Sequence, residues 1–278
     1  MSPHAESNRR KADPDDDDLP AQTRMRIGET SLNKVKASHL LKCPVSFVPI
    51  QMDGDKLVSS SGSKRLIECE VGLSDLQRMT DLFYQKAFLD ATLDSFIHSH
   101  SEPHGLRFAK WIYQQLTGSC LWDEDCRLRD KTPFPISSND QHVVFDLASA
   151  HIAARGSLKR PKEYRERAFQ LDECRVWMRL HFWAMRESGV FVQSPSFADY
   201  YVRFIGHYIG VYETQSPLFT RESLRWSADP ENIDNYIANG RRMIDVLGLS
   251  IEEARQQIPE EERSDTQWPY HTVKESIA

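Results

Sequence analysis

The stretch DECRVWMRLHFWAMRES, residues 172–188, decides the fold of this chain. Two acidic residues at its start stand where negative charge stabilises the positive end of a helix dipole. Its large apolar residues recur at helical spacing and form one stripe, made of Val176, Trp177, Leu180 and Trp183–Ala184. The pattern predicts one long amphipathic helix that packs on a core through this stripe.

Helical spacing continues on both sides of this stretch. The segment 196–213 is apolar over more than one face, which predicts a central helix. The capping-box pattern from Ser74 to Gln77 predicts a helix start near residue 74, and Pro103 and Gly118 bound a second helix. We expect further helices at 142–154 and 230–247, a loop at 119–141 and an exposed basic excursion at 155–167.

No strand alternation and no internal repeat stands out, so the expected fold class is all-α. Residues 1–65 hold an acidic run and a flexible SSSGS tract, which predicts a mostly disordered arm. Its apolar piece at 42–52 is expected to dock on the domain, although two prolines make a central strand improbable. We expect the main domain at 66–215, and a C-terminal helical extension with a frayed acidic tail at 216–278.

Composition excludes several classes of protein. The 278 residues carry a net charge of −6, which does not call for nucleic acid or an anionic membrane as partner. No run of eighteen apolar residues predicts a membrane span, and the N-terminus has no apolar segment typical of a secretion signal. Five cysteines without a CxxC pair favour reduced thiols and a cytoplasmic location. A homodimer is left open.

No catalytic signature is present: the chain has no G-x-S-x-G, P-loop, G-x-G-x-x-G or H-E-x-x-H motif. Histidines occur near the aromatic helices, yet no pair at positions i and i+4 makes a convincing zinc or di-iron site. The sequence therefore indicates neither a known catalytic motif nor a metal site built from protein side chains.

Three segments read together resemble the truncated (2/2) haemoglobins, and most closely their group II. They are FYQKAFLDATLDSFI (83–97), HGLRFAKWIYQQLTGS (104–119) and FQLDECRVWMRLHFWAM (169–185). The resemblance spans about residues 70–213. It implies a globin-like helical sandwich with extra helices, insertions and N- and C-terminal extensions, and a bound haem b.

On the distal side, the resemblance implies four residues. Tyr84 matches the distal tyrosine, and His104 falls at the distal-helix position that faces the ligand. Phe108 lies one turn further along the same helix face and would pack on the macrocycle. Trp177 matches the tryptophan whose indole N–H reaches bound ligand.

The resemblance also implies the proximal side and the packing around it. His151 is the expected iron ligand, because it lies upstream of Phe169 as the family's proximal histidine lies upstream of its Phe-x-Ile stretch. This reading requires residues 152–165 to be an insertion. Ile97 stands where the family commonly has an aromatic residue on the haem, and Phe96 is the expected substitute.

The function implied is binding of O2 or another diatomic ligand by haem iron, with NO or peroxide chemistry as a redox variant. A rival from another class is a haem-free globin-fold module for interaction or sensing. A third hypothesis is an unrelated all-α enzyme, but no catalytic motif in the sequence supports it.

Overall fold

The computed structural model describes residues 46–97, 99–128, 151 and 153–271. The chain divides into two compact units, and the first, Met1–Lys42, lies outside the described residues. The described part of the second unit is mostly helical, which confirms the all-α class. Its elements are β1 Gln51–Asp53, β2 Lys56–Val58, α1 Ser61–Arg65, η1 Leu66–Val71, α2 Gly72–Ala87, η2 Leu93–Phe96, α3 His104–Thr117, α4 Leu121–Leu128, η3 Lys162–Tyr164, α6 Leu171–Glu187, α7 Val190–Gln193, α8 Pro195–Tyr212, η4 Ser216–Phe219, α9 Thr220–Trp226, α10 Pro230–Ala238, α11 Ile251–Arg255 and α12 Glu260–Arg263.

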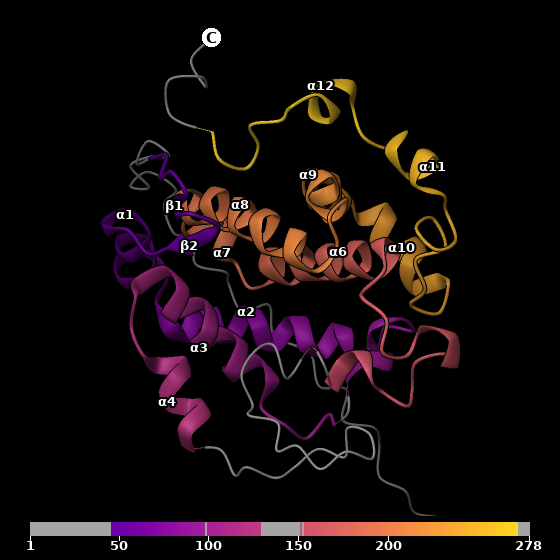
Figure 1. Cartoon of the computed structure of the whole chain (residues 1–278), viewed down its shortest axis with the longest axis horizontal. Helices are drawn as coiled ribbons and strands as arrows, with labels where there is room; N and C mark the ends of the chain where they lie inside the picture. Colours follow the sequence, from indigo (N-terminus) through magenta and orange to yellow (C-terminus); the bar gives the residue numbers. More distant parts are fainter. Residues whose placement is uncertain (1–45, 98, 129–150, 152, 272–278) are drawn as a thin grey trace, which may run out of the picture. The chain divides into compact units, whose positions relative to one another are not determined.

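The long helices of this unit form two layers, with α2 and α3 in one and α6 and α8 in the other (Figure 1). Helix α2 packs on both α3 and α6, so it connects the layers. The predicted stripe of α6 is buried as expected at Val176 and Leu180, both fully inaccessible to solvent. Burial of each such side chain stabilises the fold by about 1.5–3 kcal/mol.

Helix α8 is central, as its all-round apolar character predicts. Ser194 caps its first turn, because the Ser194 hydroxyl accepts a hydrogen bond from the Phe197 amide at 3.1 Å. Aromatic side chains are buried on more than one of its faces, among them Phe197, Tyr200 and Phe204. The aromatic-rich second half of the sequence therefore supplies one layer of the core.

Helices α2 and α3 approach each other closely at Gly105. A Cβ atom at this position would collide with the Asp81 side chain and lie 2.9 Å from the Asp81 Cα. The Thr80 hydroxyl donates a hydrogen bond of 2.7 Å to the Gly105 carbonyl across this contact. Helix α3 then ends as predicted, at Gly118 with a φ of +73°.

Helix α2 begins at Gly72, two residues before the predicted start near Ser74, and the predicted capping bond of Ser74 is absent. The backbone breaks between the π-helix η1 and α2, where Gly72 has a φ of +79° and a ψ of 164°. A reciprocal cap occurs earlier, where the Ser60 hydroxyl accepts from the Ser63 amide at 3.0 Å and the Ser63 hydroxyl from the Ser60 amide at 2.8 Å.

Two other predicted boundaries differ from the structure, and a third lies mostly outside the described residues. The expected loop at 119–141 contains α4, and its remainder from 129 onward lies outside the described residues. The expected helix at 142–154 is described only at 151 and 153–154, which are helical. Helix α10 ends well before residue 247, because Gly240 and Arg241 adopt positive φ angles of +67° and +58°.

The described part of the predicted docking piece, residues 46–52, packs on the helices as predicted, and residues 42–45 lie outside the described residues. Val48, Ile50 and Leu57 are buried, and Arg203 of α8 donates to the Val48 carbonyl at 2.9 Å. Strands β1 and β2 pair antiparallel within this segment, although no strand was expected. Three-residue strands are too short to produce a readable alternation.

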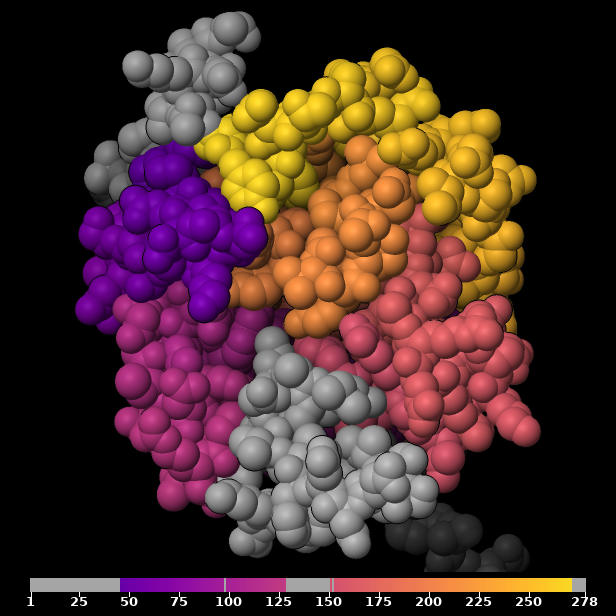
Figure 2. Space-filling model, in the orientation of Figure 1, coloured from indigo at the N-terminus to yellow at the C-terminus, as the bar shows by residue number. Residues whose placement is uncertain are grey.

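The segment after α10 is ordered along residues 250–271, and the prediction of a frayed tail is wrong there. Ala254 and Ile258 are buried, and Arg221 of α9 forms an ion pair of 2.9 Å with Asp265. This segment lies against α8 and α9 (Figure 2, yellow on orange). In the described residues, no helix is both long and apolar enough to span a membrane.

Candidate functional site

The four predicted distal residues come together from three helices. The Tyr84 ring of α2 stacks with the His104 ring of α3 at 5.1 Å between centroids. Phe83, the neighbour of Tyr84, contacts Trp177 of α6 edge-on at 5.4 Å. Phe108 contacts the same Trp177 at 6.1 Å. We call Phe83, Tyr84, His104, Phe108 and Trp177 the Tyr84 group.

Hydrogen bonding in the Tyr84 group leaves two donors for a ligand. His104 Nε2 donates to the Ser99 carbonyl at 2.7 Å, since a carbonyl only accepts, and this contact fixes the ring. Desolvation by burial lowers the pKa of His104 below its ordinary value, so the imidazole is neutral at pH 7. Burial raises the pKa of Tyr84 to about 12, which keeps its hydroxyl protonated. Among the described residues, neither the Tyr84 hydroxyl nor the Trp177 indole N–H has a hydrogen-bond partner, so these two donors of the group remain.

The predicted iron ligand lies in a second aromatic group. His151 contacts Phe169 edge-on at 5.8 Å and Tyr212 of α8 at 4.5 Å. Phe96 of η2 contacts the same Phe169 at 5.3 Å. We call His151, Phe169, Tyr212 and Phe96 the Phe169 group. The structure thus brings His151 and Phe169 together, although eighteen positions separate them in the sequence.

All the predicted site residues except Ile97 are partly accessible to solvent, in contrast to the buried side chains of the core. Ile97 is buried in the hydrophobic cluster that also contains Phe83. The other predicted residues retain partial exposure of their rings: they are Tyr84, Phe96, His104, Phe108, His151, Phe169 and Trp177. Large aromatic side chains gathered with part of their surface accessible are typical of the walls of a binding site.

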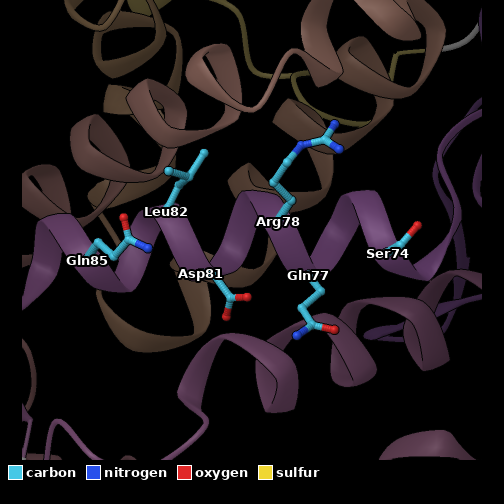
Figure 3. Close-up of a pocket in the computed structure, with 6 residues that line it drawn as sticks. All are labelled: Ser74, Gln77, Arg78, Asp81, Leu82 and Gln85. Atoms are coloured by element: carbon cyan, nitrogen blue, oxygen red, sulfur yellow. The ribbon is translucent and has the colours of Figure 1, made fainter.

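Two shallow cavities border the Tyr84 group. One of about 220 Å³ is open to solvent and lined in part by Tyr84, Phe88 and His104. The other, of about 390 Å³, follows one polar face of α2 from Ser74 to Gln85 (Figure 3). Both cavities share Asp81 and Gln85, so they adjoin each other along α2 up to the Tyr84 ring.

One buried pair at the site was missed from the sequence. His181 of α6 stacks on Trp177 with centroids 4.7 Å apart and planes 5° apart, and its Nε2 lies 2.8 Å from the Tyr201 hydroxyl. Burial lowers the pKa of His181 to about 3. The pair fixes the position of Trp177. Its only sequence signal is the spacing of four between residues 177 and 181, which puts both on one helix face.

The segment that follows His151 is not a simple exposed excursion. Exposure is as predicted at Lys162 and Arg167, but Arg160 is buried, so the prediction is wrong at that residue. Arg160 Nη2 donates to both oxygens of Glu173, at 2.8 and 3.1 Å, and its guanidinium lies 4.7 Å from the Phe96 ring centroid. A paired carboxylate allows this cation to be buried beside the Phe169 group.

The donor set fits haem in chemistry. A haem needs one axial ligand from the protein, and the His151 imidazole stands among rings that offer flat apolar surface. A site built from three or more clustered His, Cys, Asp or Glu side chains is absent from the described residues.

Comparisons with known proteins identify no relative. No protein-family model matches the chain, no curated protein matches it, and no solved structure matches its fold. The family resemblance carried by the three sequence segments thus stays a prediction.

Proposed function

We propose that this chain is a haem protein of globin-like fold that binds O2 or another diatomic ligand. The observation that carries the proposal is the convergence of Tyr84, His104, Phe108 and Trp177 from α2, α3 and α6, with their rings partly exposed.

Each side of the proposed site has a distinct task. His151 would hold the haem iron through an imidazole nitrogen, and its contacts with Phe169 and Tyr212 position the ring for that role. Haem iron, when bound, supplies the position at which a diatomic ligand is held. Tyr84 and Trp177 donate hydrogen bonds toward the partial negative charge of that ligand. Each such bond contributes about 1.5–3 kcal/mol.

The rival function is a haem-free interaction or sensing module. Direct ring packing favours it, because Trp177 stacks on His181 and also contacts Phe83 and Phe108 without an intervening group. The two proposals differ in one measurable property, which is haem affinity.

The deciding experiment is an absorption spectrum of the purified chain before and after addition of haem. We expect a Soret band, and we expect the His151→Ala variant to lose it or to recover it only with added imidazole. His207→Ala is the matched control, because His207 of α8 is half-buried but pairs with Tyr270 away from the site. If the wild-type chain acquires no Soret band after haem is added, the haem proposal is wrong and the haem-free module is supported.

A further inference from the structure

Aromatic rings line the cavity of about 220 Å³ that borders the Tyr84 group. Tyr84 lies in the last turn of α2 and Phe88 directly after it, with their ring centroids 5.9 Å apart. His104 stacks on Tyr84 at 5.1 Å and His100 on Phe88 at 4.3 Å, so both rings are held in place. Because the face of an aromatic ring attracts positive charge within about 6 Å, this wall suits a cation.

One carboxylate at the same cavity lacks a partner. Asp81 is partly buried and projects from α2 toward α3 (Figure 3), where its Oδ1 would lie 1.9 Å from a Cβ atom at Gly105. Among the described residues, none forms a hydrogen bond or an ion pair with the Asp81 side chain. A partly desolvated carboxylate gains a charge-assisted hydrogen bond when a cationic donor reaches it.

The other charged side chains near Asp81 already have partners. Glu102 also lines the cavity, but its carboxylate pairs with the guanidinium of Arg107. Arg78, one turn before Asp81 on α2, pairs with Asp75 at 2.6 Å. No lysine or arginine is among the described residues that line the cavity. Its uncompensated charge is therefore the negative charge of Asp81.

The histidine at this cavity adds a second acceptor. His104 Nε2 donates to the Ser99 carbonyl at 2.7 Å, which leaves Nδ1 of the neutral ring as an acceptor. A ligand that carries several N–H donors and a positive charge therefore matches the cavity better than an anion does.

We propose that this cavity binds a small organic cation, a protonated primary amine whose ammonium group contacts the Asp81 carboxylate and the rings of Tyr84 and Phe88. The ammonium group has three N–H donors, enough for Asp81 and for Nδ1 of His104. The cavity is smaller than the roughly 300–1,000 Å³ of sites for drug-sized ligands, so the amine is small. This binding site goes beyond the proposed function, because it requires neither haem nor His151.

The test is a calorimetric titration of the full chain at pH 7 with benzylamine and, separately, with benzyl alcohol. The two probes have nearly the same shape, but only the amine is charged. For the wild-type chain we expect at least about tenfold tighter binding of the amine. Asp81→Asn keeps the size of the side chain and should lose most of that preference, with binding of the alcohol unchanged.

Two further variants complete the test. Asp234→Asn removes the same charge from an exposed position of α10 that does not line the cavity, and it should keep the preference. Phe88→Leu should weaken binding of the amine about threefold through loss of the ring, even if Asp81→Asn does not fold. Circular dichroism checks the fold of each variant.

The proposal is overturned if the wild-type chain does not distinguish the amine from the alcohol. It is also overturned if Asp81→Asn retains the preference, or if Asp234→Asn loses it equally. None of these results bears on the Soret band, so failure of this site and failure of the haem proposal are distinguishable.

Discussion

His181 shows at the scale of one residue how the core constrains the site. Its ring is completely buried between Trp177 and Tyr201, and its Nδ1 has no hydrogen-bond partner among the described residues. An imidazolium in this position would have no anion to stabilise it, so the neutral form is strongly favoured. The residue that positions Trp177 is therefore also a titrating group with a displaced pKa.

The first prediction concerns stability against pH. An unfolded histidine has a pKa near 6.5, whereas folding lowers that of His181 to about 3. Below pH 6.5 the unfolded chain binds a proton that the folded chain does not, so stability falls as the pH falls toward 3. The contribution reaches about 1.4 kcal/mol per pH unit.

Urea unfolding at pH 7.5, 6 and 5 measures this effect. Relative to the wild type, His181→Gln should reduce the slope of the unfolding free energy against pH by the contribution of about one bound proton. Glutamine can still accept a hydrogen bond from Tyr201 but does not titrate. His100→Gln is the control, since the His100 side chain is 48% exposed. Burial also lowers the pKa of His104 and His207, so the comparison is between variants. An unchanged slope in His181→Gln would show that this residue is not the one responsible.

At the scale of elements, the contact of α2 with α3 decides whether the Tyr84 group forms. Gly105 lets the two helices approach, and its neighbour His104 then reaches the Tyr84 ring. A larger residue at 105 would push α3 away from backbone as well as side-chain atoms of α2. Because a helix backbone cannot shift at one residue alone, the larger side chain would weaken the packing of α2 against α3 along their whole contact.

The second prediction is that Gly105→Ala lowers the free energy of unfolding by about 1–3 kcal/mol, the usual cost of overpacking. Chemical denaturation measures it. Ser74→Ala on the exposed face of α2 is the control and should change stability by less than about 0.5 kcal/mol, because Ser74 caps nothing. Equal effects of the two substitutions would refute the close contact at Gly105.

At the scale of the whole molecule, the docked N-terminal segment is part of the described core. Its residues Val48, Ile50 and Leu57 are buried, and the Ser63 hydroxyl donates to the Leu116 carbonyl at the end of α3 at 2.7 Å. This segment lies inside the arm that the sequence assigned to 1–65. The first compact unit, by contrast, ends at Lys42.

The third prediction separates these two parts. A chain of residues 43–278 should unfold with the free energy of the full chain, because it keeps the second compact unit whole. A chain of 66–278 should lose at least about 3 kcal/mol, since it loses three buried apolar side chains worth about 1.5–3 kcal/mol each. Circular dichroism with urea compares the three proteins. A 66–278 chain as stable as the full one would show that the arm contributes nothing.

The sequence by itself determined the helices whose signals are local. The spacing of apolar residues defines α6 and α8, and Gly118 marks the end of α3, because helical period and chain reversal depend on neighbouring residues only. Two pairs of the predicted distal residues are in contact, Tyr84 with His104 and Phe108 with Trp177, while their role in ligand binding stays a prediction.

Only the tertiary structure decided which side chains from distant segments meet. Ser74 caps nothing because α2 already starts at Gly72, after the break in the backbone at that glycine. Arg160 is buried beside the Glu173 carboxylate that pairs with it. The pairing of His181 with Tyr201 and the position of Arg155 on Phe169 follow from the same kind of contact. These features depend on packing between distant segments and on the pairing of buried charges with opposite charges. Neither effect produces a periodic pattern in the sequence.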